Sequence, residues 1–178
     1  MSQFIVPTKE QVSPASQQAF DSLQKALGFV PNLFATMAHS DNGLPRYLAF
    51  SSAKSSLSNK EKEVVNLVVS EVNGCEYCLS AHTVLGKMNG FSDEEILELR
   101  SGKSENTKID ALVKLSKEIT EKKGSVADQT LEAFFQAGYN KGHVVDVIMQ
   151  IGDKVVTNYL YSISQIPIDF PAAPALNV

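Results

Sequence analysis

Two cysteines and one histidine, Cys75, Cys78 and His82, lie close together near the middle of the 178-residue chain, and the chain has no other cysteine. Cysteines at this spacing are used by dithiols that cycle to a disulfide. In a helix, Cys78 and His82 lie about one turn apart on the same face, so the imidazole can take the thiol proton or stabilise the thiolate. The segment therefore predicts a redox dithiol with a candidate base beside it.

The residues before the dithiol predict a helix boundary. Asn73-Gly74 is a typical helix end, which places Cys75 at the start of the next helix. A helix start favours the thiolate, whereas a free thiol with a pKa of about 8.5 is only a few per cent ionised at neutral pH. This argument alone predicts that Cys75 is the more acidic thiol.

The same residues allow two other interpretations. The cysteines can be small buried hydrophobic residues. Alternatively, Cys75, Cys78 and His82 can be three ligands of a zinc ion, with His143 or a neighbouring subunit as the fourth, although zinc sites usually draw their ligands from two separate loops or hairpins. A covalent haem would need a histidine where the chain has Leu79. We therefore predict no metal and no cofactor apart from a redox-active Cys75–Cys78 disulfide.

Length and composition predict a single domain over residues 1–178, because 43% hydrophobic content supports a full core. The net charge is −4 and the lysines form no basic block, so no nucleic-acid partner is expected. No segment reaches the roughly 18 apolar residues of a membrane span, and the N-terminus lacks the pattern of a signal peptide. We therefore expect a cytoplasmic protein, in which reducing conditions favour a catalytic or metal-binding Cys-x-x-Cys over a structural disulfide.

Helical periodicity and capping signals predict an all-α fold with about eight or nine helices and no convincing strand. Ser58 with Glu61, and Ser92 with Glu95, form capping boxes. The valine-rich run 64–69 is compatible with a strand, but the polar helical residues before it favour a buried helix. The predicted helices are 14–28, 31–37, 44–50, 58–73, 75–88, 92–101, 109–124, 131–138 and 140–163, followed by an extended tail at 167–178.

The motif Glu71-x-x-x-Cys75-x-x-Cys78-x-x-x-His82, within a helical chain, resembles the alkylhydroperoxidase D-like branch of the carboxymuconolactone decarboxylase family. The similarity to its uncharacterised peroxidase-related members covers nearly the whole chain. It also includes Phe29-Val-Pro-Asn-Leu-Phe, Lys54-Ser-Ser-Leu-Ser, Gly86-Lys-Met-Asn-Gly-Phe, Ala137-Gly-Tyr and Gly152-Asp-Lys-Val-Val-Thr-Asn-Tyr. The resemblance implies a single-domain helical bundle, a homo-oligomer (trimer or hexamer), and reduction of organic hydroperoxides with electrons from a lipoyl-bearing or thioredoxin-like dithiol protein.

The resemblance also implies roles for the motif residues. Cys78 matches the cysteine that attacks the peroxide, Cys75 matches its disulfide partner, and His82 matches the histidine of the proton relay. This assignment conflicts with the helix-start argument, which makes Cys75 the more acidic thiol. We favour the implied roles, because burial beside Glu63 would raise the pKa of Cys75.

Two acids and a tyrosine complete the candidate site. The relay glutamate implied by the resemblance lies twelve residues before the first cysteine, at Glu63, and Glu71 is a second candidate acid. Members with the best-defined relay carry a histidine directly before the second cysteine, where this chain has Tyr77. Tyrosine titrates near pH 10 and is a poor proton shuttle at neutral pH, so Tyr77 is a secondary candidate.

Two other functions stay open. The protein can be a redox-sensing or metal-binding oligomer without turnover, or, as the wider family name suggests, a lactone decarboxylase. The decarboxylase branch generally lacks the dithiol, and the only arginines, Arg46 and Arg100, are predicted to be peripheral, which leaves no evident dicarboxylate site. An apolar pocket beside Cys78, lined by Phe50, Leu79 or the last helix, would favour organic peroxides over hydrogen peroxide.

Overall fold

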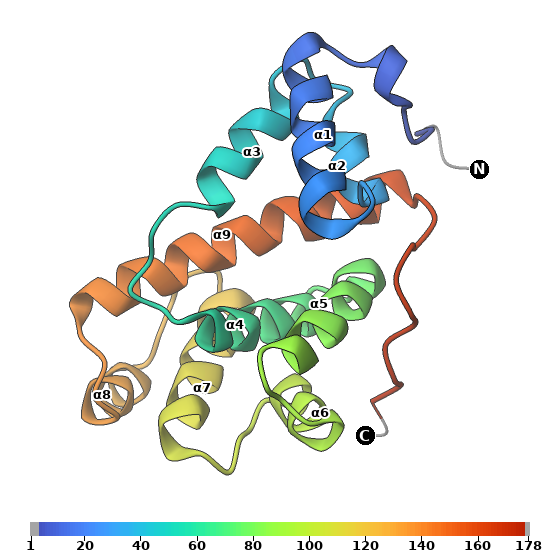
Figure 1. Ribbon diagram of the computed structural model, residues 1–178. Coiled ribbons are helices and arrows are strands. Elements are labelled where there is room, and N and C mark those ends of the chain that lie inside the picture. The colour runs from blue at the N-terminus through green and yellow to red at the C-terminus, as the bar shows by residue number, and fades with distance from the viewer. Residues whose placement is uncertain (1–3, 177–178) are drawn as a thin grey trace. The chain divides into compact units, whose positions relative to one another are not determined.

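The computed structural model describes residues 4–176, and within this range the regular elements are all helical (Figure 1). The all-α prediction is confirmed. A 3-10 helix, η1 (Lys9–Gln11), precedes nine α-helices: α1 (Pro14–Leu27), α2 (Asn32–Met37), α3 (Gly43–Ser51), α4 (Asn59–Val72), α5 (Glu76–Met88), α6 (Asp93–Ser101), α7 (Thr107–Glu121), α8 (Asp128–Gln136) and α9 (Lys141–Ser164). No helix in this range is long and apolar enough to cross a membrane. Residues 167–176 form no helix, as predicted, and 177–178 lie outside the described residues.

The chain divides into two compact units, each of which has its own core. The first comprises the residues up to 54 together with 159–169, and its apolar core includes Phe20, Leu23 and Leu44. The second comprises residues 55–158 and the tail from Phe170 onward, and it holds all the candidate site residues. The prediction of a single domain stays a prediction.

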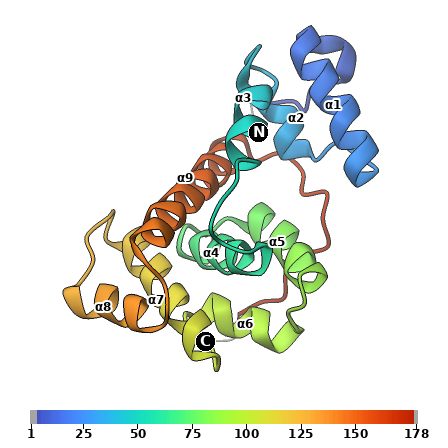
Figure 2. The same cartoon turned by 60° about the vertical axis from the view of Figure 1, so that its left-hand side comes forward.

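Helix α4 is central to the second unit, where it packs against α5, α6 and α7 (Figure 2). The valine-rich run lies inside it, and Val64, Val65 and Val69 are fully buried. Burying each of these side chains contributes about 1.5–3 kcal/mol. The prediction of a buried helix is therefore confirmed, and α4 is a rigid support for polar groups on the same helix.

The turn between α4 and α5 forms where the sequence predicts it. Asn73 caps the end of α4, Gly74 adopts a φ of 62°, which glycine tolerates without strain, and Cys75 is the N-cap residue of α5. The Cys75 N–H donates to the backbone oxygen of Ser70 at 2.9 Å. This turn holds the dithiol at the first turn of α5.

Helix α9 buries polar residues that its periodicity does not predict. Val147 and Ile151 are buried in the core, but Val145 and Ile148, which belong to the predicted apolar stripe, are about half exposed. In the part of the helix that belongs to the second unit, four polar side chains are buried instead: Asp153, Lys154, Thr157 and Asn158. Buried polar side chains need partners, and the partners in this unit lie around the dithiol.

The tail contacts α5 in the second unit. The rings of Phe170 and Tyr77 meet edge to face with 5.7 Å between centroids, and the Ala173 N–H donates to Ser80 Oγ at 3.3 Å. Figure 2 shows the tail passing this helix. The tail therefore covers part of the helix that carries the dithiol.

Candidate dithiol site

A buried carboxylate–imidazole pair joins α4 to α5. His82 Nδ1 lies 2.7 Å from Glu63 Oε2, each residue is 7% exposed, and Asn66 Nδ2 donates to Glu63 Oε1 at 3.1 Å. Burial raises the pKa of Glu63, but the charge and hydrogen bond of His82 outweigh burial, so this pKa lies below its ordinary value. The structure thus brings together Glu63 and His82, which the sequence analysis ranked first as relay acid and base.

The two cysteines are buried free thiols that interact with each other. The Cys75 thiol donates to Cys78, and this bond together with burial raises the pKa of Cys75. The same bond lowers the pKa of Cys78 below its ordinary value despite burial, with further lowering by the charges of Lys154 and His82 and by a hydrogen bond from Thr157. Cys78 is therefore the more acidic thiol.

This order of acidity overturns the helix-start argument, which assigned the lower pKa to Cys75. The proximity of the N-terminus of α5 is outweighed by the bond between the sulfurs and by the cations beside Cys78. The order agrees with the role that the resemblance implies for Cys78. The cause differs from our expectation, because the pKa of Cys75 rises through Cys78 and burial rather than through Glu63.

Helix α9 contributes a buried lysine that the sequence analysis did not assign. Lys154 is 5% exposed, and its Nζ lies 3.0 Å from His82 Nε2 and 3.3 Å from Asp153 Oδ2. Lysine is almost never fully buried without a partner. One sequence feature could have indicated this lysine: Asp153-Lys154 interrupts an otherwise apolar helical period. The pair also lies in a segment that carries the family resemblance.

Six side chains close a ring of hydrogen bonds and ion pairs across three helices. Besides the contacts already given, Gln150 Nε2 donates to Asn66 Oδ1 at 2.7 Å and to Asp153 Oδ2 at 3.3 Å. The ring contains Glu63 and Asn66 of α4, His82 of α5, and Gln150, Asp153 and Lys154 of α9. Such a network fixes each member in one orientation.

The ring determines how His82 acts on the dithiol. Its Nδ1 faces Glu63 and its Nε2 faces Lys154, so both ring nitrogens are engaged. In this arrangement the imidazole acts on Cys78 through its charge rather than through a nitrogen directed at the sulfur. Direct transfer of the thiol proton to His82, as the spacing suggested, would require one of these two contacts to open.

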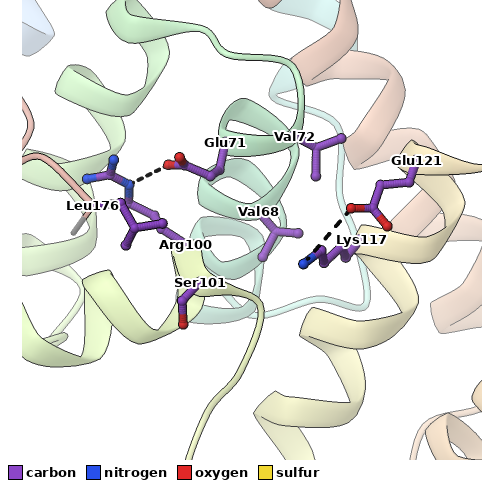
Figure 3. A pocket seen from close by; sticks show the side chains of 8 residues that line it. All are labelled: Val68, Glu71, Val72, Arg100, Ser101, Lys117, Glu121 and Leu176. Carbon is purple, nitrogen blue, oxygen red and sulfur yellow. Dashed lines mark hydrogen bonds and ion pairs between the residues drawn. The ribbon is translucent and has the colours of Figure 1, made fainter. Parts of the chain in front are cut away.

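The structure places Glu71 elsewhere. Its Oε2 accepts from Arg100 Nε at 2.7 Å (Figure 3). Arg100 Nη1 also donates to the Pro174 oxygen at 2.6 Å. The Arg100 side chain is only 4% exposed, so the prediction that this arginine is peripheral is wrong. The pair borders a cavity of about 310 Å³ lined by Val68, Glu71, Val72, Arg100, Ser101, Lys117, Glu121 and Leu176.

The secondary candidate Tyr77 is buried in the first turn of α5, where it contacts the aromatic ring of Phe170. It is not one of the six side chains of the polar network.

Neither the cavity at Glu71 nor a smaller one of about 200 Å³ between α7 and α8 is lined by Cys78. The predicted apolar substrate pocket therefore stays a prediction.

The zinc interpretation gains no support from the geometry. Among residues 4–176, no three or more His, Cys, Asp or Glu side chains are grouped so that they could hold a metal ion. The proposed fourth ligand, His143, accepts the Asn140 N–H at its Nδ1 and lies against the Tyr139 ring at the start of α9.

Comparison with known proteins gives a family match over part of the chain. Residues 37–113 match the model of the carboxymuconolactone decarboxylase family, and this span includes Glu63, both cysteines and His82. The matched span is less than half of the chain, so the chain is similar to this family over that span. The resemblance drawn from the motif is thereby confirmed, while no curated protein matches the chain.

Three solved structures share the fold of this chain. An uncharacterized peroxidase-related protein from Silicibacter sp. TM1040 has a TM-score of 0.80 at 22% identity, covering 93% of this chain and 91% of that one. A protein from Ralstonia eutropha JMP134, described as an alkylhydroperoxidase AhpD core and as peroxidase-related, has a TM-score of 0.83 at 18% identity, with 94% and 92% covered. The debrominase Bmp8, in complex with 2,3,4-tribromopyrrole, has a TM-score of 0.76 at 14% identity, with 95% and 94% covered.

Proposed function

We propose that this protein is a thiol-dependent peroxidase that reduces organic hydroperoxides through Cys75 and Cys78. The observation that carries the proposal is the buried thiol pair, in which Cys75 donates to Cys78 and cations further lower the pKa of Cys78. A lowered pKa makes Cys78 a thiolate at neutral pH, and the thiolate is the nucleophilic form.

The first step breaks the oxygen–oxygen bond. The Cys78 thiolate attacks the distal oxygen of the hydroperoxide and becomes a sulfenic acid, and the other oxygen leaves as an alkoxide. The alkoxide takes the proton that Cys78 had given to the relay containing Glu63 and His82, and is released as an alcohol. Sulfur is oxidised and the peroxide is reduced by two electrons.

The second step converts the sulfenic acid to a disulfide. Cys75 attacks the sulfenic sulfur, its proton joins the departing hydroxide as water, and the Cys75–Cys78 disulfide forms. A lipoyl-bearing or thioredoxin-like protein then reduces the disulfide by thiol exchange and supplies two electrons. The cycle uses no cofactor besides the disulfide, and we propose that it takes place in a cytoplasmic homo-oligomer, a trimer or hexamer.

A second candidate function is reductive dehalogenation, favoured by the shared fold with the debrominase that binds 2,3,4-tribromopyrrole. Here the dithiol gives two electrons to the carbon–bromine bond, bromide leaves, a proton takes its place on carbon, and the same disulfide results. Peroxide reduction remains our first proposal, because two similar folds belong to proteins described as peroxidase-related.

The deciding experiment follows thiols and substrate together. Reduced protein is mixed with one equivalent of cumene hydroperoxide, and we expect two thiols lost for each peroxide consumed. Cys78→Ser should abolish the reaction. Cys75→Ser should lose one thiol and form a sulfenic acid that dimedone traps. Dithiothreitol should then support repeated turnover of the wild type.

Other outcomes of this assay support other functions. Stoichiometric oxidation that dithiothreitol reverses, without sustained peroxide turnover, supports a redox sensor and contradicts a peroxidase. Release of bromide from 2,3,4-tribromopyrrole, without peroxide consumption, supports dehalogenation. Thiols that oxidise no faster than free cysteine contradict both enzymatic proposals.

A further inference from the structure

The mechanism above does not use Lys154, a buried ionisable group of the site. Lys154 Nζ lies 3.0 Å from His82 Nε2, and His82 Nδ1 lies 2.7 Å from Glu63 Oε2, so the three side chains form one line of contacts. A lysine at 5% exposure is costly to keep charged unless it is compensated. Its compensation here comes from Asp153 Oδ2 at 3.3 Å and from the line that ends at Glu63.

The contact between Lys154 and His82 can hold a transferable proton. An ammonium group only donates, so a charged Lys154 requires His82 Nε2 to accept, and a charged imidazole requires the amine of Lys154 to accept. In either case one positive charge lies between the two groups. A positive charge on either group lowers the pKa of Cys78, so this proton balances the Cys78 thiolate whether it lies on Lys154 or on His82.

We propose that Lys154 carries the proton that Cys78 gives up in the reduced protein and returns it, together with His82, to the oxygen that leaves the peroxide. This inference rests on the proposed peroxidase function and deepens it. Asp153 and Gln150 hold the lysine in place through the ring of six side chains.

The protons balance over a cycle. The reduced site holds a Cys78 thiolate, a Cys75 thiol and the Lys154 ammonium. Cleavage of the peroxide uses the lysine proton to make the alcohol, and the Cys75 proton leaves in water, so the oxidised site holds a disulfide and a neutral amine. An external dithiol restores two thiols, and the Cys78 proton passes back to Lys154.

A proton carrier predicts dependence on the leaving group. An alkyl hydroperoxide expels a strongly basic alkoxide that needs a proton, whereas a peracid expels a carboxylate that does not. Donation by a positioned acid typically contributes about 10²–10⁴-fold to the rate. Loss of the carrier should therefore slow cumene hydroperoxide reduction much more than reduction of 3-chloroperbenzoic acid, which a merely structural role would not do.

The test measures single-turnover thiol oxidation with both peroxides in Lys154→Arg and Lys154→Met. Arginine keeps the positive charge but does not release a proton in proteins, whereas methionine lacks both. In each variant the ratio of the cumene hydroperoxide rate to the peracid rate should fall about 10²-fold. The control Lys117→Met removes a lysine on α7, outside the ring, and should leave the ratio unchanged.

The ratio is measured in whichever variant retains the wild-type helical circular dichroism spectrum. The wild type gives an independent measurement, because proton donation in the rate-limiting step predicts a solvent deuterium isotope effect on thiol oxidation with cumene hydroperoxide that exceeds the effect with the peracid. Equal slowing of both peroxides, or equal isotope effects, overturns the role of Lys154. A wild type that reacts with neither peroxide overturns the peroxidase function itself.

Discussion

Helix α4 carries two acids that each pair with a buried basic side chain at 2.7 Å, Glu63 with His82 and Glu71 with Arg100. The partners differ in what they can do with a proton. Imidazole gains and loses a proton near neutral pH, whereas guanidinium in proteins keeps its protons. At the same distance, the Glu63 pair can therefore pass on a proton, whereas the Glu71 pair is a fixed ion pair.

The surroundings of the two pairs reinforce the difference. The Glu63 pair continues into Lys154 and the polar ring beside the dithiol. The Glu71 pair instead continues into the tail, where Arg100 Nη1 donates to the Pro174 oxygen. In the proposed mechanism the first pair exchanges charge with sulfur, whereas the second pair holds a chain segment on α6.

The largest expected difference between the pairs is in the peroxidase rate. Glu63→Gln removes the carboxylate that faces His82 and should slow single-turnover oxidation by cumene hydroperoxide about 10²-fold. Glu71→Gln is the matched control on the same helix and should keep the rate within about threefold, because its pair lacks a transferable proton. Stopped-flow thiol oxidation measures both, and similar slowing in both variants would contradict the division of roles.

The second difference is in stability. Glu71→Ala leaves the Arg100 charge without its carboxylate partner at 4% exposure, which should cost about 3 kcal/mol. The melting temperature should fall by about 2–4 °C per kcal/mol. Glu121→Ala is the control, since Glu121 lines the same cavity but is half exposed in its 3.9 Å pair with Lys117, and should cost less than about 1 kcal/mol. Equal melting shifts in the two variants would show that Arg100 does not depend on Glu71.

The third difference is in pH dependence. Because the pKa of Cys78 is lowered, alkylation of the first thiol by iodoacetamide should have a midpoint below the value of about 8.5 for a free thiol. The second thiol, Cys75, should react only above that value, since its pKa is raised. Cys75→Ala should move the Cys78 midpoint upward by removing the largest lowering contribution. Glu71→Gln should leave the Cys78 midpoint unchanged. A shifted midpoint in this variant would show that the Glu71 pair acts on the dithiol.

The lowered pKa of Cys78 also predicts how the free energy of unfolding depends on pH. Between the lowered folded pKa of Cys78 and about 8.5, the unfolded thiol holds a proton that the folded thiolate has lost. Stability of the reduced protein should therefore rise with pH in this window and lose this contribution as pH falls through the folded pKa. Above about 8.5 the raised pKa of Cys75 acts in the opposite direction. Denaturant unfolding of reduced protein at several pH values measures the slope.

Local signals explain why much of this arrangement could be predicted. Asn73-Gly74 specifies the turn that puts Cys75 at the N-cap, and the capping box of Ser58 with Glu61 specifies the start of α4. Both are contacts between near neighbours in the chain. Glu63 was singled out by family resemblance, because a glutamate in a helix is otherwise most often exposed.

Long-range contacts explain what could not be predicted. Lys154 meets His82 across 72 positions and Arg100 meets Pro174 across 74, and neither pairing has a local pattern. The order of thiol acidity depends on Lys154 as well, so the helix-start argument lacked the cation that determines it. The apolar periodicity of α9 similarly gave no indication that its polar residues face the core.

The smallest expected effect concerns Tyr77, which lies next to the dithiol but contacts the tail. Tyr77→Phe keeps the edge-on contact with Phe170 and should leave the peroxidase rate within about twofold, because a phenol that titrates near pH 10 is a poor proton shuttle at neutral pH. Tyr77→Ala removes a ring that is 3% exposed and should cost about 3 kcal/mol of stability. Rates and melting temperatures of the two variants separate proton transfer from packing. If the Tyr77→Phe variant has a tenfold lower peroxidase rate at unchanged stability, the hydroxyl takes part in the proton relay. Tyr77 would then act together with Glu63, and its role would not be limited to packing against the tail.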